Sequence, residues 1–159
     1  MPQVDQDVVE CHEQKFLASC IPACVELVIK LLGKASSGFY DEQNACGDRT
    51  DVGFGEFNGK TVCEVTFRHL FTEQRGPSFP MQALFDRIDK ELASDRYVII
   101  SLASDSGWHM FVVYRKHGDE YHSVSKASPP NGAVTIGCYT VREVVERMQG
   151  TDILVYDPL

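Results

Sequence analysis

Cys20 is the residue whose surroundings best suit nucleophilic chemistry. It stands before Ile21-Pro22 at the start of an apolar segment. Because proline is favoured in the first turn of a helix, we expect Cys20 at a helix N-terminus. The partial positive charge there favours a thiolate, and the free backbone N–H groups can hold an oxyanion. The alternative is a buried structural cysteine, which is the interpretation given to Cys24, one turn further along.

A nucleophilic cysteine needs an imidazole that accepts its proton, and His109 is placed for that task. Ser106-Gly107-Trp108 leads into His109 at the start of an apolar run, so a glycine turn brings the histidine to the rim of a rigid strand. Gln14, six residues before Cys20, can donate a side-chain N–H to an oxyanion. Each has a plainer alternative, a solvated histidine at a strand start and a surface glutamine.

The segment that follows Cys20 predicts a buried helix. Glu26 and Lys30 are its only charged residues, and they are four positions apart on one face. Gly33 is a typical C-terminal stop. We therefore expect a helix of about three turns that begins near Cys20 and ends at Gly33.

Further helices and strands are predicted from periodicity. One helical face has apolar residues at Met81, Leu84, Phe85, Ile88 and Leu92. A second, short amphipathic helix is expected within 141–148. Strands are expected at 96–102, 109–114, 121–125 and 152–156, with a hairpin turn at Lys116-His117-Gly118-Asp119.

The order of these elements indicates the fold class. A helix first, then a helix followed by neighbouring strands, is typical of α+β, with helices packed on an antiparallel sheet. Residues 34–60 are rich in Gly, Ser, Asn and Asp, and we expect a loop with one short element that could shape a substrate site. Residues 61–71 fit either a helix or a strand. The 159 residues are expected to form a single domain, 1–159.

Charge and hydropathy exclude several classes of function. The net charge is −8, from 15 Lys and Arg against 23 Asp and Glu, whereas nucleic-acid binders present basic surface. No apolar segment is long enough to span a bilayer, and no signal peptide is evident. We therefore expect no nucleic-acid and no membrane partner, and a protein that is cytoplasmic or exported without a classical signal peptide.

The six cysteines could form three disulfides, but a chain without an export signal is expected to keep its thiols reduced. A structural zinc site is disfavoured because Cys20 and Cys24 have no matching pair of Cys or His at a usual spacing. No metal and no cofactor is expected.

Taken together, four segments resemble the peptidase C39 group of papain-like cysteine peptidases. In that group a glutamine and five further residues precede Cys-Gly-Pro-Ala-Cys and an apolar helix; here Gln14 precedes Cys20-Ile21-Pro22-Ala23-Cys24. Leu84 to Leu102 is similar to the helix and strand that lead to the family's histidine, and Gly107-Trp108-His109 with the strand after it is similar to the Gly-His segment. Ser128-Pro129-Pro130-Asn131-Gly132 is similar to its Asp-Pro-x-x-Gly. The resemblance covers roughly residues 14–156, with 34–80 unmatched.

The resemblance implies a papain-like fold, in which an N-terminal buried helix that carries the cysteine packs on an antiparallel sheet. Cys20 is then the nucleophile, His109 the base and Gln14 an oxyanion donor. The group that orients the imidazole is Ser128 or, as a second choice, Asn131.

Two residues depart from the family pattern. Ile21 stands where the family has glycine, and Ser128 where it has aspartate, so the hydroxyl brings no charge to stabilise an imidazolium. Trp108, together with Gly107, is expected to line the substrate site, with the indole covering the pair formed by Cys20 and His109.

The expected function is a thiol-dependent hydrolase that cleaves a peptide or amide bond of a peptide or protein substrate through an acyl-enzyme on Cys20. The same chemistry on a glutamine side chain gives a deamidase or a transglutaminase-like protein-modifying enzyme. The missing acidic group leaves a third possibility, a catalytically weak or inactive peptide-binding pseudoenzyme.

Overall fold

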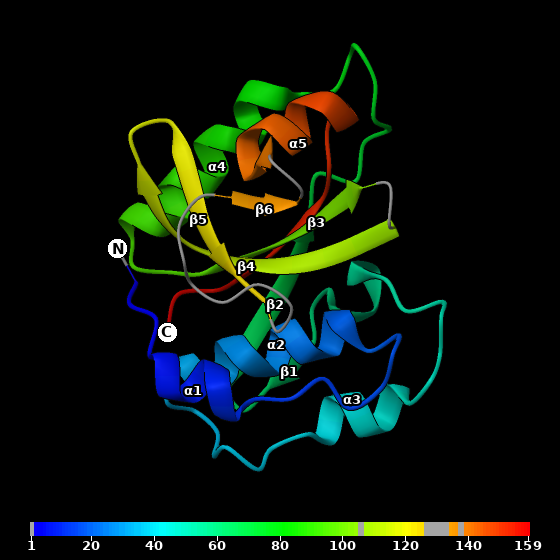
Figure 1. Ribbon diagram of the computed structural model, residues 1–159, viewed down its shortest axis with the longest axis vertical. Coiled ribbons are helices and arrows are strands. Elements are labelled where there is room, and N and C mark those ends of the chain that lie inside the picture. Colours follow the sequence, from blue (N-terminus) through cyan, green and yellow to red (C-terminus); the bar gives the residue numbers. More distant parts are fainter. Residues whose placement is uncertain (1, 105–106, 126–133, 137–138) are drawn as a thin grey trace.

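The structure is a computed structural model that describes residues 2–104, 107–125, 134–136 and 139–159. Ser128 and Asn131, the two candidates for the group that orients the imidazole, lie outside the described residues. The fold is α+β, as predicted: a six-stranded antiparallel sheet has helices on both faces (Figure 1). Among the described residues, none of the helices is long and apolar enough to cross a membrane.

The sheet brings together strands that are far apart in sequence. Its order is β1-β2-β8-β3-β4-β5, so the last strand of the chain lies in the middle of the sheet. The strands are β1 (Thr61–Val62), β2 (Val65–Leu70), β3 (Val98–Ser104), β4 (Gly107–His117), β5 (Glu120–Val124) and β8 (Ile153–Tyr156). A separate pair is formed by β6 (Val134–Ile136) and β7 (Tyr139–Thr140). The four predicted strands are confirmed, with ends shifted by a few residues, and His117 pairs with Glu120 across the predicted hairpin turn.

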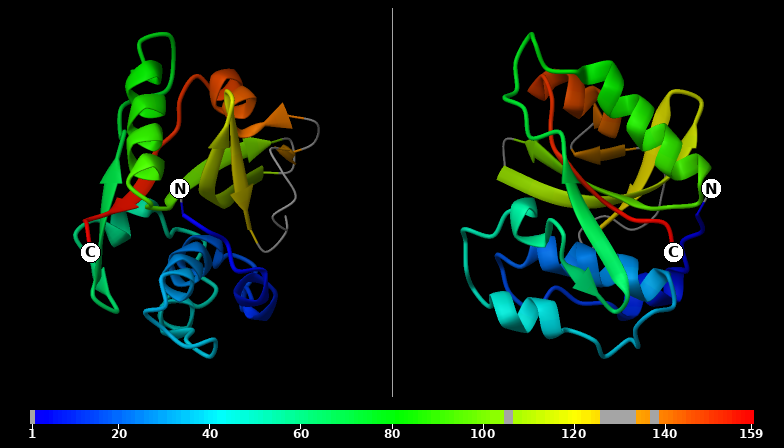
Figure 2. Two further views of the ribbon diagram at one scale, coloured as in Figure 1. Left: turned by 90° about the vertical axis from the view of Figure 1, so that its left-hand side faces the viewer. Right: turned by 180° about the vertical axis from the view of Figure 1, so that it is seen from behind.

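The helices separate into two groups, one on each face of the sheet. Figure 1 shows α4 (Met81–Ala93) and α5 (Val141–Met148) above the sheet, and α1 (Gln6–Cys11), α2 (Cys20–Leu31) and α3 (Asp41–Cys46) below it. Figure 2 shows the same separation from the side and from behind. The predicted helices that begin near Cys20 and Met81 are therefore confirmed.

Two segments differ from the sequence-based expectation. Residues 34–60 contain two short elements rather than one, α3 and the 3₁₀ helix η1 (Phe54–Phe57). The segment 61–71, which fitted a helix or a strand, contains β1 and β2. Pairing with the chain's last strand decides the second case, because Phe67 of β2 lies opposite Tyr156 of β8.

Side-chain alternation along the strands divides the core into two layers. In β3, Ile99 belongs to the layer under α2 and Ile100 to the layer under α4 and α5. In β4, Val112 belongs to the layer under α2 and Phe111 to the layer under α4 and α5. Successive residues of a strand are expected to alternate in this way. This division fixes which residues of the strand ends can reach each face.

Candidate active site

The N-terminus of α2 positions Cys20. Ser19 is the N-cap residue, and its carbonyl accepts the first helical hydrogen bond from Ala23 N–H at 2.9 Å. Pro22 has no N–H, so the backbone N–H groups of Cys20 and Ile21 remain, and both lower the pKa of the Cys20 thiol. A helix terminus with free N–H groups can also hold an oxyanion.

Burial nevertheless decides the state of the thiol. Desolvation raises the pKa of Cys20 above its ordinary value, and the two backbone N–H groups lower it by less. The expectation that the helix terminus leaves a thiolate at rest is therefore wrong for this structure, because the sulfur is partly withdrawn from water. Cys24, one turn deeper, is buried, and desolvation raises its pKa further. Cys24 is a structural cysteine, as predicted.

Three of the predicted site residues line one small cavity of about 40 Å³ between α2 and β4. Gln14 and Cys20 come from the N-terminal side, and His109 comes from β4. The rest of the lining is mostly small or apolar, and it includes His12, Ala23, Cys24, Leu27, Met110 and Ser125. The fold thus brings together residues that are up to 95 positions apart, from Gln14 to His109.

His109 approaches this cavity along the strand edge. It pairs with Leu102 of β3, and directly paired residues project to the same face of a sheet. Leu102 lies in the core layer under α4 and α5, whereas Met110 packs against the layer under α2. The imidazole therefore leaves β4 on the face away from α2, and it is not among the groups that shift the pKa of the Cys20 thiol. Proton transfer from the Cys20 thiol to His109 therefore requires the imidazole to turn around the edge of β4. This edge is free of β5 at His109, because pairing with β5 begins only at Val112.

The second histidine of the cavity, His12, is fully engaged. Its Nε2 lies 2.8 Å from the carbonyl oxygen of Ala23, so Nε2 carries the proton and donates it. Its Nδ1 lies 2.8 Å from Lys30 Nζ, so Nδ1 accepts from the ammonium group. Because both ring nitrogens of this buried side chain have partners, His12 is a structural residue. Of the two histidines that line this cavity among the described residues, His109 is the candidate base.

Gln14 shapes the loop before Cys20 instead of pointing a free amide into the cavity. Its Nε2 donates to the carbonyl oxygens of Phe16 and Leu17, both at 3.0 Å. An amide nitrogen has two hydrogens, so both are used in this state. The predicted role of Gln14 as an oxyanion donor requires one of these bonds to break when a ligand binds. The backbone N–H groups of Cys20 and Ile21 are the donors already aimed at the nucleophile.

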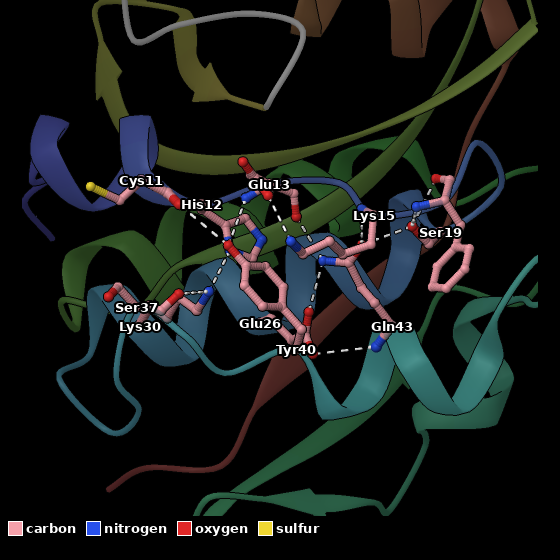
Figure 3. A network of polar contacts seen from close by, with 11 residues as sticks. Cys11, His12, Glu13, Lys15, Ser19, Glu26, Lys30, Ser37, Tyr40 and Gln43 are labelled. Carbon is pink, nitrogen blue, oxygen red and sulfur yellow. Dashed lines mark hydrogen bonds and ion pairs between the residues drawn. The ribbon is translucent and has the colours of Figure 1, made fainter.

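Gln43 of α3 holds this loop against the helices (Figure 3). Its Oε1 accepts from Lys15 N–H at 2.7 Å and lies 2.8 Å from the hydroxyl of Ser19. Its Nε2 donates to the Glu13 carbonyl at 2.8 Å and to Glu26 Oε1 at 2.9 Å. The side chain is completely buried. One amide therefore fixes both ends of the segment that carries Gln14 and leads into Cys20.

Two charged residues inside α2 complete the network. Glu26 Oε2 accepts from the backbone N–H groups of Glu42 and Gln43, and so caps the first turn of α3. Lys30 Nζ donates to the Ser37 carbonyl at 2.9 Å and lies 3.8 Å from the centre of the Tyr40 ring (Figure 3). Burial raises the pKa of Glu26 and lowers that of Lys30. Sequence reasoning missed this network, although two charges in an otherwise apolar helix were the available signal.

Trp108 does not cover the cavity that Cys20 and His109 line. It lies on the wall of a second cavity, with half of its surface exposed, and the Arg75 guanidinium stacks over its ring at 5.0 Å. The expected cover is therefore wrong: the indole packs at the end of β4 against Arg75, from the segment after β2, and not against Cys20. Gly107 begins β4 with a φ of +111°, a conformation that favours glycine, whereas Ser106, the residue before it in the predicted turn, lies outside the described residues.

The described part of the chain carries neither a disulfide nor a metal cluster. Its five cysteines are free, and no three of its His, Cys, Asp and Glu side chains gather as a metal site would require. No protein-family model matches this chain, and no curated protein is significantly similar to it. Its function therefore has to be inferred from the residues and their geometry.

Proposed function

We propose that the protein is a papain-like thiol hydrolase that cleaves a peptide or amide bond, with Cys20 as nucleophile and His109 as general base. The observation that carries the proposal is the cavity that both residues line at the N-terminus of α2. A nucleophilic thiol, backbone N–H donors and a histidine within reach are the parts that acyl transfer requires, and in this proposal the imidazole turns toward the thiol when substrate binds. Cys24, Leu27 and Met110 make the remaining wall apolar.

The resting thiol is neutral in this scheme, because burial raises its pKa. His109 takes the proton as the sulfur attacks the carbonyl carbon, and the tetrahedral oxyanion is held by the N–H groups of Cys20 and Ile21. The imidazolium then protonates the leaving amine, which leaves an acyl-enzyme. Water that loses its proton to the same imidazole releases the acid and restores the thiol.

A second candidate function is a peptide-binding pseudoenzyme. It is favoured by two observations at the site: the raised pKa of the Cys20 thiol, and the two loop carbonyls that occupy the Gln14 amide. In this case the cavity binds a chain segment and no acyl-enzyme forms.

Turnover of p-nitrophenyl acetate by the full-length chain separates the two functions. We expect a burst of p-nitrophenol, an acetyl group on Cys20 in the peptide mass map, and no burst from Cys20→Ala. His109→Ala should slow both acylation and deacylation by about 100-fold or more. His117→Ala, in which an exposed histidine at the far end of β4 is removed, is the matched control and should behave like the wild type.

Equal steady-state rates for the wild type and Cys20→Ala would exclude the hydrolase and favour the binding module. Acetylation of Cys20 that is unaffected by His109→Ala would reject the imidazole as base. With a peptide library, two fragments indicate hydrolysis of the backbone. Conversion of glutamine to glutamate without cleavage indicates the deamidase chemistry instead.

A further inference from the structure

A second cavity, of about 370 Å³, lies at the end of the sheet where β2 ends and β4 and β8 begin. It is much larger than the cavity at Cys20, and its volume is within the range of small-molecule sites. Its wall includes His69, Trp108 and Asp152 from the strand ends, and Phe71, Glu73 and Arg75 from the segment after β2.

One part of the wall is a hydrogen-bonded pair, His69 of β2 and Asp152 just before β8, which Ser101 of β3 supports from behind the wall. His69 Nε2 lies 2.7 Å from Asp152 Oδ2, and the Ser101 hydroxyl donates to Asp152 Oδ1 at 2.5 Å. The carboxylate therefore has a partner on each oxygen, and the imidazole is fixed by donating its Nε2–H to Asp152. The ring edge of His69 also contacts Phe54 of η1, with centroids 5.9 Å apart. An imidazole held in this way is pre-organised, whereas a surface histidine would lose rotamer freedom on binding.

The other part of the wall is a cation on an aromatic face. The Arg75 guanidinium stacks over Trp108, and it forms no ion pair with a carboxylate of the described residues. Stacking occupies the face of the guanidinium and leaves its N–H edges for a planar acceptor. The indole itself is half exposed at the cavity. Such a pair suits a ligand that joins a carboxylate to an apolar group.

We propose that this cavity is a second ligand site, which binds a carboxylate attached to an apolar group. Arg75 holds the carboxylate in a bidentate contact, Trp108 and Phe71 contact the apolar part, and His69 is the fixed polar group beside them. The carboxylate comes either from the C-terminus of a peptide or from an acidic side chain. The site is independent of the chemistry proposed for Cys20.

The charges around the cavity make the proposal specific. Both oxygens of Asp152 already have a hydrogen-bond partner, His69 and Ser101, so the carboxylate is held away from a ligand although it keeps its negative charge. Glu73 is exposed on the same segment as Arg75 and repels an anion. Removal of Arg75 and removal of Glu73 should therefore change the affinity in opposite directions.

Trp108 is the only tryptophan of the chain, so its fluorescence reports on the cavity directly. We would titrate full-length Cys20→Ala protein with N-acetylleucine, which has a terminal carboxylate, and with N-acetylglutamate α-amide, which has a side-chain carboxylate. N-acetylleucinamide is the neutral control. We expect a saturable change in fluorescence for at least one of the two acids, and the acid that binds more tightly identifies the source of the carboxylate.

Two exposed substitutions test the assignment without risk to the core. Arg75→Gln should weaken binding about tenfold or more, and Glu73→Gln should tighten it about two- to threefold, in low salt. Lys34→Gln removes an exposed positive charge elsewhere and should leave binding unchanged. The proposal is overturned if the neutral amide binds as well as the acids, if Arg75→Gln binds like the parent, or if no probe gives saturation by about 10 mM. None of these outcomes bears on acetylation of Cys20, which is measured separately in the wild type.

Discussion

Trp108 and His109 are consecutive residues of β4, yet they line two different cavities. The pairing of β4 with β3 places Trp108 opposite Ala103 and His109 opposite Leu102, so the two side chains leave the strand on opposite faces. Near the start of β4, His109 thus belongs to the cavity at Cys20, and Trp108 belongs to the cavity at Arg75. A one-residue slip of this register would exchange the two faces and disrupt both sites.

The pH dependence of Cys20 alkylation tests the resting state of the thiol. Burial raises its pKa, and the thiolate is the form that reacts. In the folded protein, iodoacetamide labelling of Cys20 should therefore rise with pH through a range above that of the same cysteine in the urea-unfolded chain. Peptide mass mapping after short pulses gives both profiles from one sample.

The unfolded chain is the matched control because it contains the same thiol without the fold. A folded profile that rises at lower pH than the unfolded one would contradict the neutral thiol. It would indicate instead that the His109 imidazole has turned around the strand edge and stabilises a thiolate.

Substitution of Gln43 tests whether α3 supports the loop before Cys20. Gln43→Leu removes two donors and an acceptor from a buried site and takes a hydrogen-bond partner from Lys15 N–H, the Glu13 carbonyl and Glu26 Oε1. Unsatisfied buried groups cost about 1–3 kcal/mol each, so the free energy of unfolding should fall by about 2–4 kcal/mol. Urea unfolding followed by circular dichroism measures this change.

Asn44→Ala is the control for Gln43→Leu, since Asn44 is the next residue of α3 and is exposed. Its effect should stay within about 0.5 kcal/mol. If the two substitutions cost the same, the hydrogen bonds of Gln43 do not hold the loop, and the network is not what positions Cys20.

Much of the scaffold could be predicted because it follows from local patterns. The apolar run with Pro22 near its start and Gly33 after its end determines α2, and the spacing of Met81 and Leu92 determines one face of α4. The candidate nucleophile followed from the same logic, because a helix N-terminus is a local property. The position of β8 between β2 and β3 is not local, and no periodicity in the sequence indicates it.

The partners of the candidate site could not be predicted, because they depend on which segments meet. Gln43 lies in a stretch whose composition indicates a loop, and its role comes from Glu26, 17 positions earlier. His69 had no predicted role, and its partner Asp152 is 83 positions away. The surroundings of Trp108 were predicted wrongly because its partner Arg75 lies 33 positions earlier, in a segment that no sequence pattern connects to β4.

The pH dependence of stability tests the buried carboxyl of Glu26. Burial raises its pKa in the folded state, and its three hydrogen bonds from Glu42 and Gln43 offset only part of that effect. Above the unfolded pKa of about 4.3, the folded protein therefore binds more protons at this site than the unfolded chain, so this site's contribution to stability falls as pH rises. The side chain of Glu26→Gln cannot titrate. The free energy of unfolding of this variant minus that of the wild type should therefore increase with pH between the unfolded and the folded pKa of Glu26, and then level off.

Only the slope of that difference is diagnostic. The amide of Glu26→Gln places an N–H group among donors, which costs a constant amount at every pH. Urea titrations of both proteins from mildly acidic to neutral pH give the slope directly. A difference that decreases with pH would mean that the hydrogen bonds outweigh burial and that the pKa of Glu26 is depressed.

Gly150→Ala tests how the segment between β2 and α4, which contains Phe79, packs against the turn that follows α5. Its φ is +122°, and a Cβ at this position would lie 2.4 Å from a ring carbon of Phe79. Gly150→Ala therefore combines a backbone conformation that is nearly restricted to glycine with a clash in a buried contact, and should lower the free energy of unfolding by about 2–4 kcal/mol. Gly33 has a φ of +72° and nothing within 4 Å of the same Cβ, so Gly33→Ala should cost only about 1–2 kcal/mol. The difference between the two variants in urea unfolding therefore measures the contact with Phe79 together with the greater backbone strain at +122°, and equal losses would show that neither adds to the cost.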